Sequence, residues 1–308
     1  MAAPMAKKNV ALILGANELL ADTAAALERS RNFDRVVTAG TAAAGDLKPV
    51  EAVDLLARGA ERRLSEILAE VAPTVLVDLW RSESVEYPER VGRYDAAAAE
   101  AIVAGLRLWT GRGGKPCRVV VLSSTAIYGL SSLSPVLRAE SDDLDAATPD
   151  DHGRWVEELR ERESIYRRLA GERAWRVLCL RAAAIVGGPV RSEITDYLDS
   201  PLPVRAAGFD PPIQLLHYSD LVDAIERGAS EDVDGTLNIV GRGVVPLSRL
   251  AALGGRVALP VPLMFARRLA PAALGAEALR WRCVADGKRA EQVLGFHARY
   301  TAEEAVAA

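Results

Sequence analysis

Short runs of consecutive apolar residues alternate with longer amphipathic stretches over the first 190 positions of this chain. The apolar runs predict strands and the amphipathic stretches predict helices. The expected strands are residues 10–14, 35–39, 51–55, 74–79, 118–122 and 175–181, and the expected helices are residues 20–29, 60–71, 94–110 and 155–169. Because the strands lack polar alternation, both of their faces should be covered, as in a parallel, doubly wound α/β sheet.

This rhythm breaks after Gly187-Gly188-Pro189, where proline and glycine become frequent and the expected helices become short. We therefore expect a Rossmann-type parallel sheet in residues 1–189 and a smaller C-terminal lobe in residues 190–308, interleaved with the first part. Residues 139–151 are acidic and small, which indicates a surface loop. The apolar segment 259–281, which carries Arg267 and Arg268, is expected to form a lobe helix rather than a partner or membrane surface.

Composition narrows the classes of function. A net charge of −4 and an aromatic content of 5% argue against a nucleic-acid groove. The apolar run at residues 10–14 is too short for a signal peptide, and no run is long enough to span a bilayer. No Cys/His spacing suggests a metal site. We expect a cytoplasmic protein without a metal and without a membrane surface.

Four segments carry a resemblance to a known family. They are Ser123-Ser124-Thr125-Ala126-Ile127-Tyr128-Gly129, Leu180-Arg181 followed by Gly187-Gly188-Pro189, His217-Tyr218-Ser219-Asp220, and Leu294-Gly295-Phe296 followed by Tyr300-Thr301. In this order they resemble the extended short-chain dehydrogenases/reductases, in the NAD-dependent epimerase/dehydratase branch. The resemblance implies a dinucleotide cofactor, a catalytic tyrosine–lysine pair, and a substrate pocket near Ser124, Tyr128, Arg181 and Asp220.

The phosphate-binding turn departs from the family pattern Gly-x-x-Gly-x-x-Gly. It reads Gly15-Ala16-Asn17-Glu18-Leu19-Leu20-Ala21. A carboxylate in place of the middle glycine adds bulk and like charge beside the pyrophosphate. Two unit charges about 4 Å apart repel by roughly 4 kcal/mol at an effective dielectric near 20, or about three decades of affinity. Either the Glu18 carboxylate interacts favourably with the helix dipole at an anion-binding site that holds no ligand, or its side chain turns aside and admits a cofactor.

Two further positions of the cofactor cleft differ from the pattern. The second strand ends Val36-Val37-Thr38-Ala39-Gly40 without the acid that usually holds the adenosine ribose. Asp54-Leu55 matches the family's pair beside the adenine. Trp80 follows the fourth strand, where the family has a small residue; it either fills the cleft or lies at a surface or interface. We expect no cofactor, or NAD or NADP if the cleft is open.

The tyrosine–lysine pair is missing. No lysine occurs between Lys115 and Lys288, and no tyrosine has a lysine four residues later. In the helix that should carry the pair, the tyrosine position falls on His152 or Trp155 and the lysine position on Val156 or Leu159.

Remnants of catalytic function are therefore limited to Ser124, Thr125 and His152. Ser124 aligns with the family's substrate-orienting hydroxyl. His152 is expected in a solvated loop, with a substitute acid as the alternative.

Three functions follow from these observations. The first is a non-catalytic binding, scaffolding or regulatory protein, with a protein partner or a homodimer formed through helices 94–110 and 155–169. The second is a remodelled enzyme or small-ligand binder that uses Ser124, His152, Arg181 and Asp220 for non-redox chemistry. The third is an NAD(P)-dependent oxidoreductase or epimerase with unusual catalytic residues.

Overall fold

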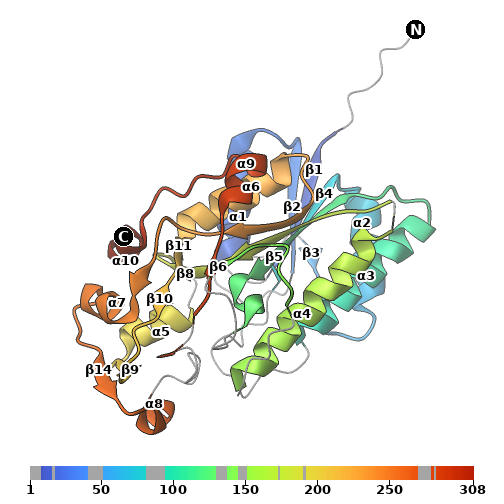
Figure 1. Cartoon of the computed structure of the whole chain (residues 1–308). Coiled ribbons are helices and arrows are strands. Elements are labelled where there is room, and N and C mark those ends of the chain that lie inside the picture. The colour runs from blue at the N-terminus through green and yellow to red at the C-terminus, as the bar shows by residue number, and fades with distance from the viewer. Residues whose placement is uncertain are drawn as a thin grey trace.

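The computed structural model describes residues 8–15, 18–40, 51–80, 94–129, 137–144, 151–172, 174–189, 192–269, 279–280 and 282–308. For residues 18, 151–155, 193 and 267–269 it describes the backbone only. Figure 1 shows a central sheet between two layers of helices, with a lobe of short elements beside it.

All seven strands of the central sheet are parallel. In spatial order they are β12 (Gly235–Ile239), β7 (Arg176–Ala182), β5 (Arg118–Ser124), β4 (Val75–Asp78), β1 (Val10–Leu14), β2 (Arg35–Gly40) and β3 (Glu51–Ala52). The order runs outward from β1 in both directions, which is the doubly wound arrangement. The predicted fold class is confirmed.

Helices cover both faces of the sheet (Figure 1). One layer contains α2 (Ala60–Val71), α3 (Tyr94–Gly111) and α4 (Asp151–Ala170), and the other contains α1 (Glu18–Ser30), α6 (Tyr218–Ser230) and α9 (Lys288–Leu294). Each layer has its own buried apolar cluster because the two faces of the sheet are filled by alternate strand residues, such as Leu12 on one face and Ile13 on the other.

The C-terminal lobe is built from short elements around a third apolar cluster. Its strands pair in twos, as β8 (Ala184–Val186) with β11 (Leu215–His217), β9 (Val204–Ala206) with β14 (Leu259–Val261), and β10 (Pro212–Ile213) with β13 (Val245–Pro246). Its helices are α5 (Glu193–Asp199), α7 (Leu247–Leu253), α8 (Leu263–Leu269) and α10 (Ala302–Ala307). The chain leaves this lobe to form α6 and β12 and then returns to it.

Most predicted elements agree with the structure, and two differ. The first strand and the 60–71 helix have the predicted bounds. Only Glu51–Ala52 of the predicted strand 51–55 pairs, because it lies at the edge of the sheet. The loop prediction for His152 is wrong: α4 begins at Asp151, so His152 lies in its first turn.

Two searches of the described residues were negative. No described helix combines the length and apolarity needed to cross a bilayer. No group of three or more His, Cys, Asp or Glu side chains in the described segments is arranged to hold a metal ion.

Candidate functional site

The structure describes the two ends of the turn after β1, and Ala16 and Asn17 between them lie outside the described residues. The strand ends at Leu14, the amide of Gly15 donates to the carbonyl of Ala39 at 3.1 Å, and α1 begins at Glu18. Leu19 and Leu20 are buried under the turn. Asn17 and the side chain of Glu18 lie outside the described residues. A helix N-terminus with a carboxylate residue in its first turn therefore stands where the pyrophosphate would bind.

The end of β2 presses closely on this turn. A Cβ atom at Gly40 would lie 1.8 Å from the carbonyl oxygen of Gly15, so no side chain fits at that position. The described part of β2 contains no acidic residue. A ribose-binding carboxylate is therefore absent from the strand itself, and residues 41–50 lie outside the described part.

The remaining candidates on the cofactor side lie at the ends of β3 and β4. Asp54 is exposed, and its Oδ1 accepts a hydrogen bond from the amide of Leu56 at 3.0 Å. Leu55 and Trp80 are buried in the same apolar cluster as Leu14. A bulky indole thus occupies the protein interior near the carboxyl ends of these strands, on the side covered by α2 and α3. Its exclusion of a dinucleotide stays a prediction.

Helix α4 is fastened to the carboxyl end of β4 by a buried ion pair. Arg162 Nη2 lies 2.6 Å from Asp78 Oδ2 and 3.2 Å from the carbonyl oxygen of Trp80, and the Arg162 guanidinium also donates to the carbonyl of Leu122. Tyr166 donates to Asp78 Oδ2 at 2.6 Å. These charged groups are almost fully buried. Burial would lower the pKa of Arg162, but Asp78 outweighs it and the pKa is raised, so Arg162 keeps its charge.

A second buried network fastens α4 to β5 and β7. Glu163 receives a two-point contact from Arg181, with Nε 3.0 Å from Oε1 and Nη2 2.7 Å from Oε2, and it accepts from Ser123 Oγ at 2.5 Å. Arg181 Nη1 also donates to the Tyr128 hydroxyl at 3.0 Å, which in turn donates to Asn238 Oδ1 at 2.8 Å. Two of the predicted substrate-pocket residues, Tyr128 and Arg181, are thus brought together, but their polar atoms bind one another inside the protein.

Both tyrosines of these networks are poor proton donors and acceptors near neutral pH. Burial raises the pKa of Tyr128, and burial together with Asp78 raises the pKa of Tyr166 well above its usual value. A catalytic tyrosine needs the opposite shift, which a nearby ammonium group provides. Neither tyrosine is therefore a ready substitute for the missing one.

The helix face that should carry the lysine is aliphatic. Val156 and Leu159 are both buried, and Leu159 packs in one cluster with Ile127 and Tyr128 beside the end of β5. In either alignment of the lost pair, an aliphatic side chain therefore stands at the lysine position. The side chains of His152 and Trp155, the two candidates for the tyrosine position, lie outside the described set.

Ser124 and Thr125 remain partly accessible at the end of β5. Ser124 caps the short 3-10 helix η3 (Thr125–Tyr128) by accepting a hydrogen bond from the amide of Ala126 at 3.2 Å. This capping role fixes the direction of the serine oxygen and leaves its own proton available. Ser124 ends β5 and Thr125 begins η3, and a catalytic role for these two hydroxyl groups stays a prediction.

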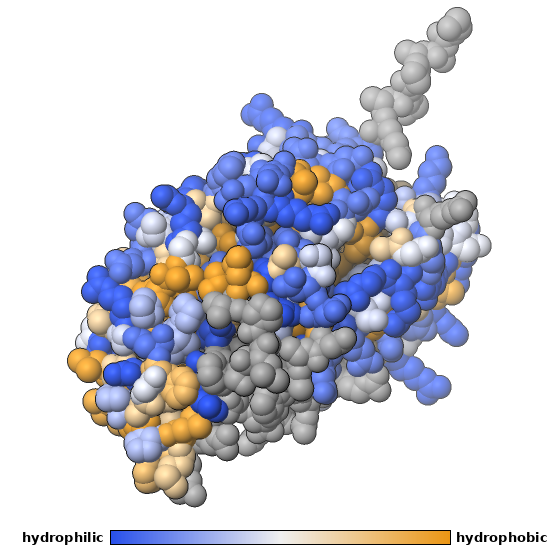
Figure 2. Space-filling view, in the orientation of Figure 1, coloured by the Kyte–Doolittle hydropathy of each residue, from blue (hydrophilic) through white to orange (hydrophobic). Residues whose placement is uncertain are grey.

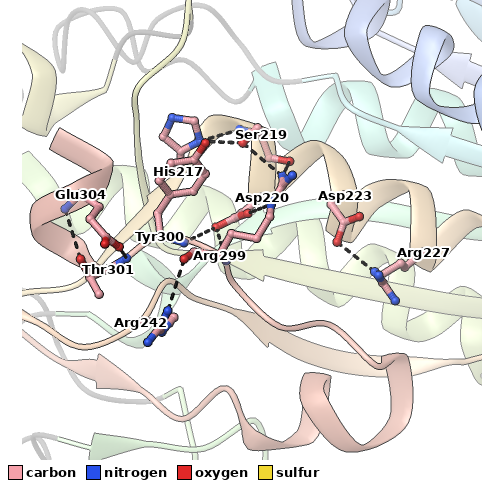
Figure 3. A network of polar contacts seen from close by, with 10 residues as sticks. All are labelled: His217, Ser219, Asp220, Asp223, Arg227, Arg242, Arg299, Tyr300, Thr301 and Glu304. Carbon is pink, nitrogen blue, oxygen red and sulfur yellow. Dashed lines mark hydrogen bonds and ion pairs between the residues drawn. The ribbon is translucent and has the colours of Figure 1, made fainter. Parts of the chain in front are cut away.

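Asp220 belongs to a structural junction between α6 and the C-terminal segment (Figure 3). Its Oδ1 accepts from Arg299 Nε at 2.8 Å, and its Oδ2 accepts from the backbone amides of Arg299 and Tyr300 at 3.0 and 3.3 Å. His217 caps α6, accepts from Ser219, and stacks on the Tyr300 ring at 3.9 Å. Burial lowers the pKa of His217. The motif that carried the resemblance thus ties the chain terminus to the domain.

A groove of about 610 Å³ lies past the carboxyl end of β12. Its lining includes Gln214, Val244, Arg242, Asp286, Lys288 and His297. Gln214 is held in place by two hydrogen bonds to the backbone of Ala285, at 2.8 and 3.0 Å. The groove combines both signs of charge with apolar walls, which is suited to a small polar ligand.

Sequence reasoning missed the residues that dominate this edge of the sheet. Arg162, Glu163 and Asp78 were not among the candidate site residues, because charged residues are usually exposed. One signal was available: Arg162 and Glu163 interrupt a helix face that otherwise continues through Leu159, Ile165 and Leu169.

Comparisons with known proteins agree with the geometry at the level of the fold. No family model matches the sequence. An uncharacterised protein of Mycobacterium tuberculosis (strain ATCC 25618 / H37Rv) is 30% identical over 182 residues, which are 58% of this chain and 48% of that protein. An uncharacterised protein of Mycobacterium bovis matches equally. The chain spans about half the length of the curated relatives it matches.

Solved structures resemble the chain over nearly its whole length. The UDP-glucose 4-epimerase of Thermotoga maritima, solved with UDP-glucose, has a TM-score of 0.70 at 13% identity and covers 96% of both chains. MoeE5 in complex with UDP-glucose and NAD has a TM-score of 0.70 at 20% identity, over 97% of this chain and 96% of its own. WbmG of Bordetella bronchiseptica, solved with NAD, has a TM-score of 0.66 at 15% identity, over 99% of this chain and 94% of its own. The chain therefore has the Rossmann-type fold of the UDP-glucose 4-epimerase and of these other solved structures.

Proposed function

We propose that this protein is a non-catalytic or functionally diverged protein on an epimerase/dehydratase-like fold, and that it acts by binding, as a scaffold or regulator. The observation that supports this proposal best is the inner face of α4. Where the fold's usual chemistry needs an amine, the face presents buried Val156 and Leu159, and the next turn is committed to the ion pairs of Arg162 and Glu163.

The physical argument concerns proton transfer. A tyrosine becomes an effective acid or base near neutral pH only if its pKa is lowered by a neighbouring cation. Tyr128 has such a cation in Arg181, but burial outweighs it and the net pKa is raised. Without a relay, a bound sugar nucleotide would not lose its hydroxyl proton at a useful rate.

The first test uses the intact chain. NAD, NADP and UDP-glucose are the ligands to add, because neighbouring structures contain NAD and UDP-glucose. We expect no thermal stabilisation by either dinucleotide at submillimolar concentration and no epimerisation of UDP-glucose with added NAD. Stabilisation together with turnover would overturn the proposal and favour an NAD-dependent enzyme with unusual residues.

A second function, a small-ligand binder, rests on a separate observation, the groove beside β12. Its ligand would be a small polar molecule with an anionic group near Lys288 and Arg242 and a donor or cationic group near Asp286 and Glu291. Mass spectrometry of the natively purified protein tests this: a co-purified small molecule that is lost from a Lys288→Glu variant supports it. An empty protein, or retention by the variant, counts against it.

A further inference from the structure

The far end of the C-terminal lobe exposes a group of apolar side chains, which we call the lobe tip. It consists of Leu202, Val257, Leu259, Met264 and Phe265. Val257 is 77% exposed and Met264 is 69% exposed. Figure 2 shows hydrophobic surface gathered at the end of the molecule where Figure 1 places β9, β14 and α8.

Backbone pairing brings these residues together on one surface. Strands β9 and β14 run parallel with Val204 opposite Leu259, so Leu202 and Val257, each two residues before those positions, lie at the same end of the pair. The amide of Leu259 donates to the carbonyl of Pro203 at 2.9 Å, which fixes this register. Helix α8 follows β14 directly and presents Met264 and Phe265.

The segment that carries four of the five lobe-tip residues contains no acidic side chain. From residue 235 to residue 276 the sequence contains no aspartate or glutamate and five arginines, of which Arg249 pairs with Glu303 at 3.0 Å, whereas the whole chain has a net charge of −4. The remaining residues therefore carry a net charge of −9. Arg256 donates to the carbonyl of Ser200, a neutral partner, so its charge is not cancelled by that contact. Arg267 and Arg268 lie in α8.

We propose that the lobe tip docks on an anionic lipid surface. Apolar side chains at a protruding end insert into the boundary between headgroups and acyl chains, while arginines contact anionic headgroups. A protein partner would have to supply a matching concave surface, whereas a fluid bilayer adapts to a convex tip. This differs from the expectation from sequence alone, which favoured a lobe helix over a partner or membrane surface for segment 259–281.

The test is co-sedimentation of the intact chain with vesicles of phosphatidylglycerol and phosphatidylcholine, compared with phosphatidylcholine alone. We expect binding to the anionic vesicles only, weakened by salt because the Debye length shortens. Met264→Glu and Val257→Glu should each weaken binding about tenfold or more, since each removes a buried apolar side chain from the bilayer. Arg267→Gln with Arg268→Gln should weaken it about fivefold per arginine.

Val293→Glu is the matched control, because Val293 is an exposed apolar residue on α9 and the change adds the same charge. It should bind like the unmodified protein, and thermal melts should show that all variants fold. Absence of sedimentation, equal binding to neutral vesicles, or equal binding by Met264→Glu would overturn the proposal. Binding to soluble polyglutamate but not to vesicles would overturn it in favour of an acidic protein.

Discussion

The two sides of the candidate cleft differ in how deeply their departures from the family pattern are built into the fold. On the cofactor side, the departures are separate substitutions: Glu18 at the start of α1, Trp80 after β4, and no acidic residue in β2. On the catalytic side, Arg162 and Glu163 hold α4 against β4, β5 and β7 through buried ion pairs. The cofactor side differs by single substitutions, whereas on the catalytic side a network of buried ion pairs stands beside the positions of the tyrosine–lysine pair.

This difference indicates that dinucleotide binding and proton transfer can be altered independently of each other. A dinucleotide at this position needs room beside Trp80 and the removal of the like charge of Glu18. A proton relay on α4 would need an amine at a position that is now buried and apolar, where desolvation disfavours the charged form. We therefore expect substitutions to favour dinucleotide binding more readily than they restore a proton relay.

The largest expected effect is on stability, from the catalytic side. Arg162→Met leaves Asp78 buried without its cation and should lower the free energy of unfolding by about 3–5 kcal/mol. Urea denaturation of the purified variant measures this. Arg168→Met, on the exposed side of the same helix, is the matched control and should change stability little. A loss below about 1 kcal/mol for Arg162→Met would mean that α4 is held mainly by its apolar contacts.

The next effect is on ligand affinity, from the cofactor side. Glu18→Gly should strengthen NAD binding by about three decades, the equivalent of roughly 4 kcal/mol of removed repulsion, as measured by calorimetry. Glu18→Gln separates the two causes, because it removes the charge and keeps the bulk. Neither variant should gain turnover of UDP-glucose. Epimerisation by Glu18→Gly would show that the catalytic side is intact and would end the distinction between the two sides.

The smallest expected effect is on the pH dependence of the unfolding free energy. It arises at the His217 junction, which belongs to neither the cofactor side nor the catalytic side. Because burial lowers its pKa in the folded protein, the unfolded chain binds more protons below about pH 6.5. Stability should therefore fall as the pH drops through this value. His217→Asn keeps a capping side chain and should flatten the dependence of unfolding free energy on pH between 7 and 5. An unchanged slope would assign the pH dependence to other groups.

The fold was largely predictable because its elements are local patterns. The buried strand at Val10–Leu14 and the amphipathic helix at Ala60–Val71 depend only on neighbouring residues, and their bounds agree with the structure. The start of α4 was harder, since Asp151, His152 and Gly153 are typical of loops, and the helix nevertheless includes them.

The site was less predictable because its contacts are distant in sequence. Arg162 meets Asp78 across 84 positions, and Tyr128 meets Asn238 across 110. Nothing local shows that a charged residue on a helix has a buried partner on a strand. The absence of the tyrosine–lysine pair could be recognised from the sequence, but what replaced it could not.

The ion pairs of α4 also determine which part of the molecule can move. Moving α4 away from the sheet would leave Asp78 and Glu163 without their cations. We therefore expect α4 to stay fixed and not to open and close over a ligand. The chain passes into the lobe at Gly187, whose φ is +73° and where a Cβ atom would lie 2.4 Å from the His217 ring, so this crossing point is closely packed and requires glycine.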